Sequence, residues 1–210
     1  MRGKEDIMNK EIIAEYHNYI NKIGNRKPLY KVVVDEYDIK TAIYPGSHID
    51  ITPSLVIPKV IYIDNFKGTI NFFNHIESIK EYLKKNSNYS VPCKVIFLDQ
   101  DYNLPLNIKK VDLIISQYAG FVGQATKDYL KVGGILLCND SHGDASLANL
   151  DDDFKLIGII DNKNKIQKQN LGKYFILPKE KPINIKKIKE NMQGLKYKNT
   201  ANNYLFRKLK

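Results

Sequence analysis

Short apolar runs, each ending in polar residues, recur along the chain and constrain its fold more than any other feature. The runs span residues 41–44, 59–63, 94–98, 111–115 and 134–138. Continuous apolar runs of this length, without strict alternation, are typical of strands buried on both faces of a parallel sheet. Between runs, residues 66–85 carry the apolar stripe of an amphipathic helix, and residues 119–131 predict a shorter helix closed by Gly133 and Gly134. This alternation predicts an α/β fold with a doubly wound, mostly parallel sheet.

Further elements are expected before and after these runs. Residues 6–23 repeat apolar side chains at three- and four-residue spacings, which predicts a helix that ends at Gly24. The β-branched segment 30–35 predicts an added strand. Residues 154–160 and 173–177 also read as strands. The segment that separates them is too short and too polar for a parallel crossover, so we expect an antiparallel pair.

The positive charge of the chain is concentrated near its C-terminus. The formal net charge is +10, and residues 179–210 contain ten Lys or Arg against two Glu. We therefore expect an N-terminal helix and strand extension over residues 1–39, an α/β domain over 40–178 and a basic tail over 179–210. Such a tail can contact nucleic acid or an acidic partner, although the richness in Lys, Asn and Ile can also reflect codon bias.

Several classes of protein are disfavoured by the sequence. Cys93 and Cys138 lie in apolar runs with no C-x-x-C spacing, which argues against a disulfide framework or a zinc site, and no other metal site is expected. No segment has the roughly 18 uninterrupted apolar residues of a membrane span. Glu5 and Asp6 argue against a signal peptide. We expect a cytoplasmic protein with no membrane partner.

Polar residues follow each of the five predicted parallel strands. They are Gly46 and Ser47 after the first, which ends in Tyr44, Asp64 after the second, Asp99, Gln100 and Asp101 after the third, Ser116 and Tyr118 after the fourth, and the cluster 139–144 after the fifth. In an open parallel sheet, ligands bind in the crevice outside the carboxyl ends of the strands. We therefore expect these residues to border one ligand-binding crevice.

This arrangement resembles the class I S-adenosylmethionine-dependent methyltransferase family over residues 40–178. The resemblance implies a Rossmann-like methyltransferase fold, with an antiparallel C-terminal strand pair and S-adenosylmethionine as cofactor. Asp64 takes the place of the acid that binds the ribose hydroxyls in the family, and residues 99–101 stand where it contacts adenine. The residues implied to bind the cofactor are Tyr44, Gly46, Ser47, Asp64, Asp99, Gln100, Asp101 and Ser116.

Two departures make the chain a divergent member of this pattern. The first loop contains Gly46 as its single glycine, where the family usually has two or three. The Asn-Pro-Pro-aromatic sequence that amino-methylating nucleic-acid enzymes place after strand four is absent. The methyl acceptor is therefore not identified by the sequence.

The cluster 139–144 contains the candidate catalytic residues. Methyl transfer needs an acceptor held in line with the methyl group and often a base that takes its proton, so His142 or Asp140 can serve. Tyr118 can stack on a planar substrate. The cluster also suits a tight turn, with Asp144 as the cap of a helix over 145–150. Both interpretations stay open at this stage.

Methyl transfer to an unidentified acceptor is the leading functional hypothesis. The alternative is a catalytically degenerate Rossmann-like binding module, whose basic tail contacts nucleic acid or a partner protein. A nicotinamide-dependent oxidoreductase is disfavoured, because the chain has no G-x-G-x-x-G sequence.

Overall fold

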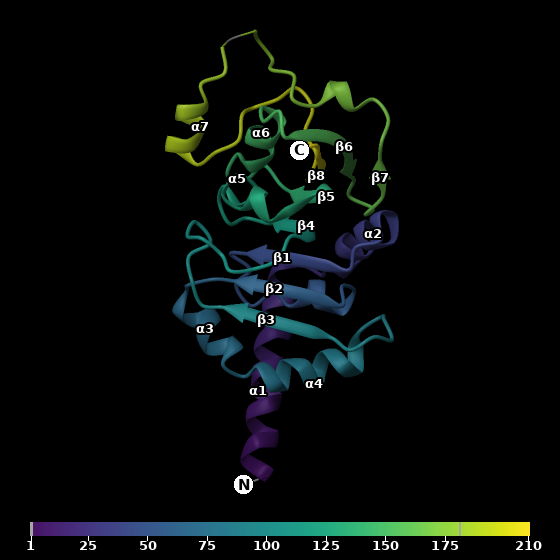
Figure 1. The fold of residues 1–210 in the computed structure, drawn as a ribbon, viewed down its shortest axis with the longest axis vertical. Coiled ribbons are helices and arrows are strands. Elements are labelled where there is room, and N and C mark those ends of the chain that lie inside the picture. The colour runs from purple at the N-terminus through teal and green to yellow at the C-terminus, as the bar shows by residue number, and fades with distance from the viewer. Residues whose placement is uncertain (1, 181) are drawn as a thin grey trace. The chain divides into compact units, whose positions relative to one another are not determined.

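Three parallel strands organise the first half of the chain. The computed structural model describes residues 2–180 and 182–210, and the chain divides into Met1–Asp101 (unit 1) and Tyr102–Lys210 (unit 2). In unit 1, the strands are β1 (Thr41–Pro45), β2 (Lys59–Ile63) and β3 (Lys94–Leu98). They lie side by side in the order β3-β2-β1, all parallel, as the sequence predicts (Figure 1).

The helices of unit 1 differ from the sequence prediction in two places. They are α1 (Arg2–Ile23), α2 (Lys27–Tyr37), the short 3-10 helix η1 (Thr52–Leu55), α3 (Lys67–Phe73) and α4 (Ile76–Asn86). The strand expected over residues 30–35 is wrong, because these residues belong to α2. Pro28 stands in the first turn of α2, and Leu29, Tyr30 and Val33 bury one face of it. The single helix expected over 66–85 is interrupted at Asn74 and His75, which separates α3 from α4.

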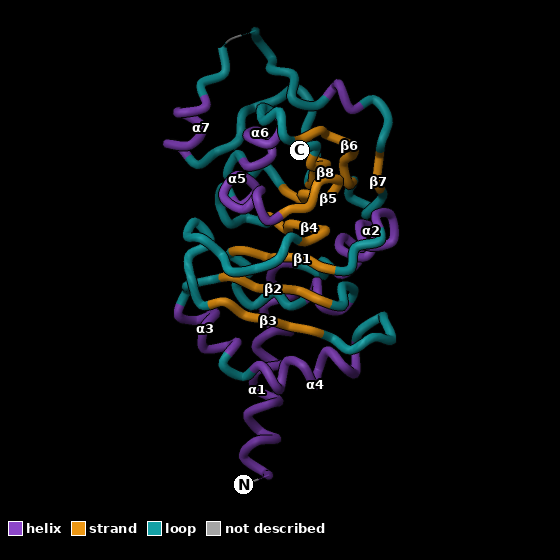
Figure 2. The backbone as a smooth tube through the Cα atoms, viewed as in Figure 1, coloured by secondary structure: helices purple, strands orange, loops and turns teal. Residues whose placement is uncertain are grey.

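Unit 2 contains five strands and three α-helices. The strands are β4 (Val111–Ser116), β5 (Leu130–Cys138), β6 (Phe154–Ile160), β7 (Ile166–Gln167) and β8 (Asn203–Lys208). The helices are α5 (Val122–Thr126), α6 (Asp144–Asn149) and α7 (Ile185–Asn191). The strand order is β4-β5-β8-β6-β7, and Figure 2 shows where these strands lie. β4 and β5 are parallel, and every later pairing is antiparallel.

The partner of β6 is the main correction to the sequence analysis. β8, not residues 173–177, lies antiparallel to β6, and it also pairs with β5. Residues 173–177 form no strand, because Phe175 has a left-handed backbone with φ +61° and its ring packs on Tyr204 of β8 at 4.9 Å. Residues 203–208, expected within a basic tail, are therefore a strand inside the sheet of unit 2. Lys181, counted in that tail, lies outside the described residues.

The helix expected over residues 119–131 is also shorter than predicted. α5 ends at Thr126, a 3-10 turn follows over Lys127–Tyr129, and β5 begins at Leu130. Leu130 is fully buried and pairs with Val111 of β4. Because Leu130 is buried and paired, β5 begins before Gly133 and Gly134, the two residues that were expected to close the helix.

Parallel strands, connecting helices and antiparallel C-terminal strands confirm the α/β, mostly parallel, Rossmann-like architecture. The antiparallel C-terminal pairing is present, although a different segment supplies it. In the described part of the chain, no helix combines the length and the apolar character needed to cross a bilayer.

We predict that truncation of Leu205 in β8 destabilises the protein. Leu205 is fully buried, so Leu205→Ala leaves a cavity between the neighbouring strands and should lower the free energy of unfolding by about 2–5 kcal/mol. Leu209→Ala is the matched control, because that side chain is 48% exposed and should cost under about 1 kcal/mol. Urea denaturation measures both values, and equal values would contradict the buried position of β8.

Candidate functional site

Gly46, Asp64 and Asp99 follow three neighbouring parallel strands at equivalent positions. The last residues of β1, β2 and β3 pair with one another. The ladder continues by one further bond on each side, since the N–H of Gly46 donates to the carbonyl of Ile63 (2.8 Å) and that of Asp64 donates to the carbonyl of Leu98 (3.2 Å). These contacts bring the three residues together at the carboxyl edge of the unit 1 strands.

The Asp64 carboxylate joins this edge to the first loop. Its Oδ2 accepts a hydrogen bond from the N–H of His48 (2.9 Å), and its Oδ1 accepts one from the N–H of Phe66 (2.9 Å). A carboxylate has about four acceptor positions, so each oxygen keeps one lone pair for another donor. Asp64 can therefore hold the loop and accept hydrogen bonds from two ligand hydroxyls.

The first loop is closed by hydrogen bonds among its own residues. Gly46 and His48 both have left-handed backbones, with φ +62° and +49°. The N–H of Ile49 donates to Nδ1 of His48 (2.7 Å), and that of Asp50 donates to the carbonyl of Ser47 (3.1 Å). Ser47 is buried, and its hydroxyl donates to the carbonyl of His48 (3.1 Å). Most N–H groups of the loop are thus used within unit 1.

Tyr44 lies beneath this loop in a buried polar cluster. Its hydroxyl donates to Oδ2 of Asp50 (3.3 Å), which also accepts from the hydroxyl of Tyr30 (3.1 Å) and from Nη1 of Arg26 (3.4 Å). Asp50 is fully buried, so these donors replace the water that its carboxylate loses. The geometry makes Tyr44 a support of the loop from the interior.

An aromatic wall that the sequence analysis missed stands beside Asp64. The ring of His48 stacks on that of Tyr19 at 4.8 Å and lies 5.8 Å from that of Phe66. Phe66 is 58% exposed although it is a large apolar side chain. The sequence indicated only that an aromatic residue stands two positions after an acid at a strand end, whereas its exposure comes from the structure. The wall offers a flat apolar surface next to a hydrogen-bond acceptor.

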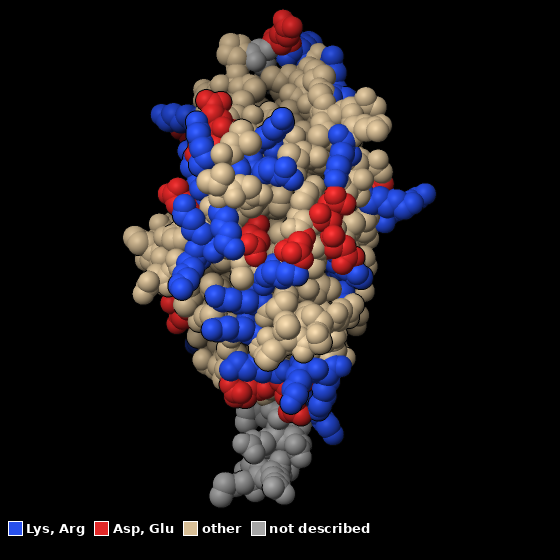
Figure 3. Space-filling view, turned by 45° about the vertical axis from the view of Figure 1, so that its right-hand side comes forward, with Lys and Arg blue, Asp and Glu red and all other residues tan. Residues whose placement is uncertain are grey.

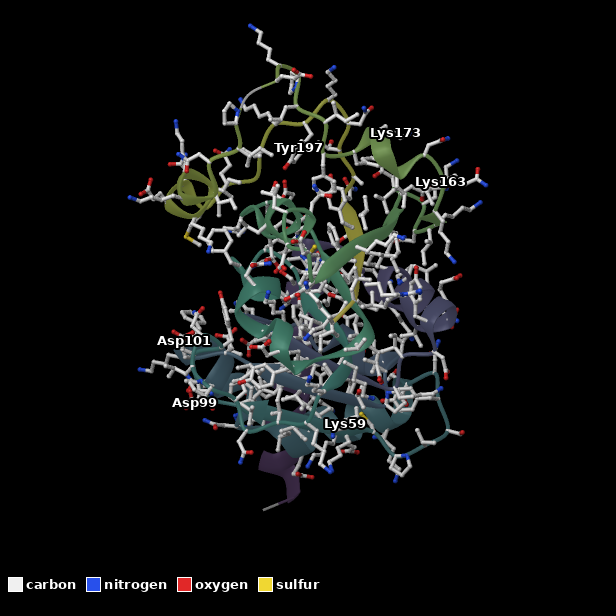
Figure 4. The ribbon with its side chains drawn as sticks, turned by 45° about the horizontal axis from the view of Figure 1, so that its top comes forward. Lys59, Asp99, Asp101, Lys163, Lys173 and Tyr197 are labelled. Atoms are coloured by element: carbon white, nitrogen blue, oxygen red, sulfur yellow. The ribbon has the colours of Figure 1, made fainter. Side chains whose placement is uncertain are left out.

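Asp99, Gln100 and Asp101 extend this edge beyond β3. The N–H of Gln100 donates to the carbonyl of Leu98 (3.0 Å), which turns the chain directly after the strand. Asp99 is exposed, and Figure 4 shows Asp99 and Asp101 on the same side of unit 1. The structure thus brings the acidic residues after β2 and β3 to one edge of unit 1.

In unit 2, a chain of amide and hydroxyl groups orients the segment after β5. The N–H of Ser141 donates to the side-chain oxygen of Asn139 (3.1 Å), so Nδ2 of Asn139 faces Gln117 and donates to its Oε1 (3.2 Å). Nε2 of Gln117 then donates to Oδ1 of Asn203 at the start of β8 (2.8 Å). A single backbone N–H therefore determines the orientation of both amides.

The same chain determines the tautomer of His142. The hydroxyl of Ser141 donates to Oδ1 of Asn139 (2.7 Å) and lies 2.9 Å from Nδ1 of His142. Because its only hydrogen is used on Asn139, Ser141 accepts from His142, and the proton of the neutral ring sits on Nδ1. Nε2 of His142 is then left with a lone pair, which is the arrangement of a general base.

Asp140 is engaged in holding α6. Its Oδ1 accepts from the N–H of Ser146 (2.7 Å) and its Oδ2 accepts from the hydroxyl of Ser146 (2.8 Å). Gly194 lies so close that an added Cβ would overlap the Asp140 carboxylate. Burial raises the pKa of Asp140, although the bonds from Ser146 oppose this shift. The geometry favours a structural role for Asp140 over that of a base.

Ser116 binds Asp144, and this pair links β4 to α6. The hydroxyl of Ser116 donates to Oδ2 of Asp144 (2.6 Å), which also accepts from the N–H of Gly123 at the start of α5 (2.8 Å). The expectation that Asp144 caps its own helix is wrong, because Gly143 is the N-cap and Asp144 is the first helical residue. Burial raises the pKa of Asp144 to about 6.

Tyr118 stands in a strained turn after β4. Its backbone is left-handed with φ +59°, and its side chain is 62% exposed. The hydroxyl of Tyr102 donates to the carbonyl of Ala119 (2.6 Å) and holds this turn in place. The turn therefore presents an exposed aromatic ring from unit 2.

Comparison with known proteins identifies the fold. Neither family models nor curated proteins match the chain. A methyltransferase from Geobacter sulfurreducens matches 95% of this chain and 89% of its own, with a TM-score of 0.52 and 10% sequence identity. The chain has the Rossmann-like methyltransferase fold.

Other solved structures match over shorter segments. The chain covers 54% of the YcgJ protein of Bacillus subtilis (58% of this chain, TM-score 0.39, 18% identity). It covers 62% of the N-methyltransferase NodS of Bradyrhizobium japonicum, solved with S-adenosyl-L-homocysteine (58% of this chain, TM-score 0.40, 13% identity). The chain thus spans little more than half of these two proteins.

The raised pKa of Asp144 predicts a pH-dependent contribution to stability. A group whose pKa is about 6 in the folded protein and 3.8 otherwise stabilises the fold below pH 4, and this contribution is lost as pH rises through 6. Relative to Asp144→Asn, the wild-type protein should lose roughly 1–2 kcal/mol of unfolding free energy between pH 5 and 7.5. Urea denaturation at both pH values measures the difference. Asp152→Asn, which removes an exposed carboxyl, is the control and should lose as much stability as the wild type over this pH range. If Asp144→Asn loses as much as the wild type too, another group causes the effect.

The hydrogen-bond chain predicts that neutral His142 carries its proton on Nδ1. Nitrogen-15 NMR distinguishes the two neutral tautomers. Asn139→Ala removes the acceptor of the Ser141 hydroxyl and should increase the share of the Nε2–H form. A dominant Nε2–H form in the wild-type protein would contradict the assigned chain.

Proposed function

We propose that the protein is an S-adenosylmethionine-dependent methyltransferase whose unit 1 binds the adenosine part of the cofactor. The observation that carries this proposal is the alignment of Gly46, Asp64 and Asp99 at one strand edge, with the exposed ring of Phe66 beside it. The methyltransferase fold supports it. In open parallel sheets, this edge is the usual place for a nucleotide-like ligand.

The residues at this edge fit a nucleoside by their chemistry. The two remaining lone pairs of Asp64 can accept the two hydroxyls of a ribose. The ring of Phe66 can stack on the flat face of adenine, and the acidic residues after β3 can accept hydrogen bonds from its amino group. Gly46 lets the backbone approach the ligand, whereas Ser47 and Tyr44 act by holding the loop from inside.

The bound cofactor would supply an electrophilic methyl group on a sulfonium. We propose that His142 is the base of the reaction. Nε2 of His142 would take the proton that the acceptor oxygen or nitrogen loses on methylation. In the neutral ring, the bonds of the Ser141 hydroxyl place the proton on Nδ1 and leave the lone pair on Nε2. Tyr118 is proposed to contact the acceptor, while Ser116 and Asp140 position the surrounding loops.

The alternative of a binding module with a basic tail is not favoured. The last part of the expected tail is β8, which pairs with β5 and β6. Nζ of Lys208 donates to the carbonyl of Lys127 (2.7 Å), so this lysine makes a hydrogen bond within unit 2. Figure 3 shows Lys and Arg interspersed with Asp and Glu on the face it presents. Deletion of residues 180–210 would remove β8 and therefore could not isolate a binding role.

We predict that S-adenosyl-L-homocysteine binds and that Phe66→Ala weakens this binding. Stacking of a base on an aromatic ring contributes about 1–3 kcal/mol, so the dissociation constant should rise at least about fivefold. Phe66 is mostly exposed, and its removal should leave stability almost unchanged. Isothermal titration calorimetry measures the constant.

The control for this titration is Val91→Ala, which truncates another exposed apolar side chain of unit 1 (53% exposed) near the amino end of β3, away from the carboxyl edge. Its dissociation constant should equal that of the wild type. No detectable binding of the ligand at millimolar concentration would overturn the proposed function.

A further inference from the structure

The segment between β6 and β8 packs on the loops that contain the proposed base. A Cβ added to Gly143 would lie 2.8 Å from Cγ2 of Ile188 and 3.2 Å from the carbonyl oxygen of Gln193. The hydroxyl of Tyr197, labelled in Figure 4, donates to Oγ of Ser146 (2.9 Å). Residues 188–197 are therefore in direct contact with both sides of the segment around His142.

This segment also lines a cavity of about 460 Å³ that is open to solvent. That volume is within the range of small-molecule sites. The apolar part of its lining is Leu177, Pro182, Ile183, Ile188 and Leu195. Ile188 and Gly194 line the cavity and also touch Gly143 and Asp140, so one wall of the cavity is shared with the loop of the proposed base.

The polar part of the lining carries only positive charge. Lys187 and Lys196 line the cavity together with Asn184, Asn191 and Gln193, and no Asp or Glu side chain is among the lining residues described. Within residues 2–180 and 182–210, neither lysine forms an ion pair, whereas Lys186 on the same helix lies 3.8 Å from Glu190. The two exposed lysines, together with the apolar lining residues, match a ligand with an apolar body and one anionic group.

We propose that this cavity binds the methyl acceptor and that the acceptor is a small amphiphilic anion, such as an aromatic or aliphatic carboxylate. The role as acceptor rests on the proposed function, whereas the preference for an anion rests on the cavity alone. The apolar residues hold the body of the molecule. Lys187 and Lys196 bind its anionic group.

Titration with 2-naphthoate and with its neutral isostere 2-naphthamide tests the preference for an anion. The two probes share one ring system, so a difference in affinity reports the charge. The carboxylate should bind to the full chain at least fivefold more tightly, and its binding should weaken as salt is added. Equal affinities would overturn the proposal.

Variants of the lining locate the binding site. Lys187→Gln combined with Lys196→Gln should weaken 2-naphthoate binding about five- to tenfold and leave 2-naphthamide binding within twofold. Ile183→Glu places a negative charge in the lining and should weaken the carboxylate at least as much. Lys186→Gln is the matched control, since this neighbouring lysine does not line the cavity. An unchanged carboxylate affinity in the double variant would contradict the assignment.

A parallel titration of each variant with S-adenosyl-L-homocysteine separates this proposal from the proposed function. Its affinity should be the same in all of them. If the protein prefers 2-naphthoate but does not bind S-adenosyl-L-homocysteine, the cavity binds anions and the proposed methyltransferase function is wrong. If S-adenosyl-L-homocysteine binds and the probes do not differ, the proposed acceptor class is wrong.

Discussion

The pairing of β8 with both β5 and β6 is the constraint on which the rest of unit 2 depends. The chain leaves the sheet after β7 and returns to it between β5 and β6, so residues 168–180 and 182–202 lie on a long path outside the sheet. Along that path the chain forms α7, lines a cavity and packs on the loop after β5. Asn203, the first residue of β8, also anchors the amide chain that orients His142. The last strand of the chain therefore sets the surroundings of the proposed base.

In unit 1, parallel strands bring the residues that follow them to one edge. Three parallel strands in register place their following residues side by side, and a single carboxylate then ties the first loop to the second strand. A loop with one glycine remains ordered because its N–H groups find partners within unit 1. We propose that the loop offers few N–H donors to the methionine part of a cofactor, and that the carboxylate of Asp64 and the exposed ring of Phe66 bind the adenosine part.

The sequence predicted the parallel strands β1 to β5 because each contains a short, mostly apolar run, and it failed where burial depends on distant partners. Residues 30–35 are β-branched, yet Tyr30 and Val33 are buried on one face of a helix. Residues 173–177 and 203–208 are similar short apolar runs, and only the pairing with β5 and β6 decides which one is the strand. In the candidate site, the residues after strands were predictable, whereas the Asn139–Gln117–Asn203 chain joins three separate segments and Phe66 stands out only through its exposure.

The central claim is that the carboxyl edge of the unit 1 strands holds an adenosine group. A crystal structure of the protein with S-adenosyl-L-homocysteine tests it most directly. The account predicts both ribose hydroxyls within about 3.2 Å of the Asp64 carboxylate oxygens, with adenine stacked on the ring of Phe66. A nucleoside bound away from Asp64 would contradict this claim, because the Asp64 carboxylate would then bond only to the N–H groups of His48 and Phe66.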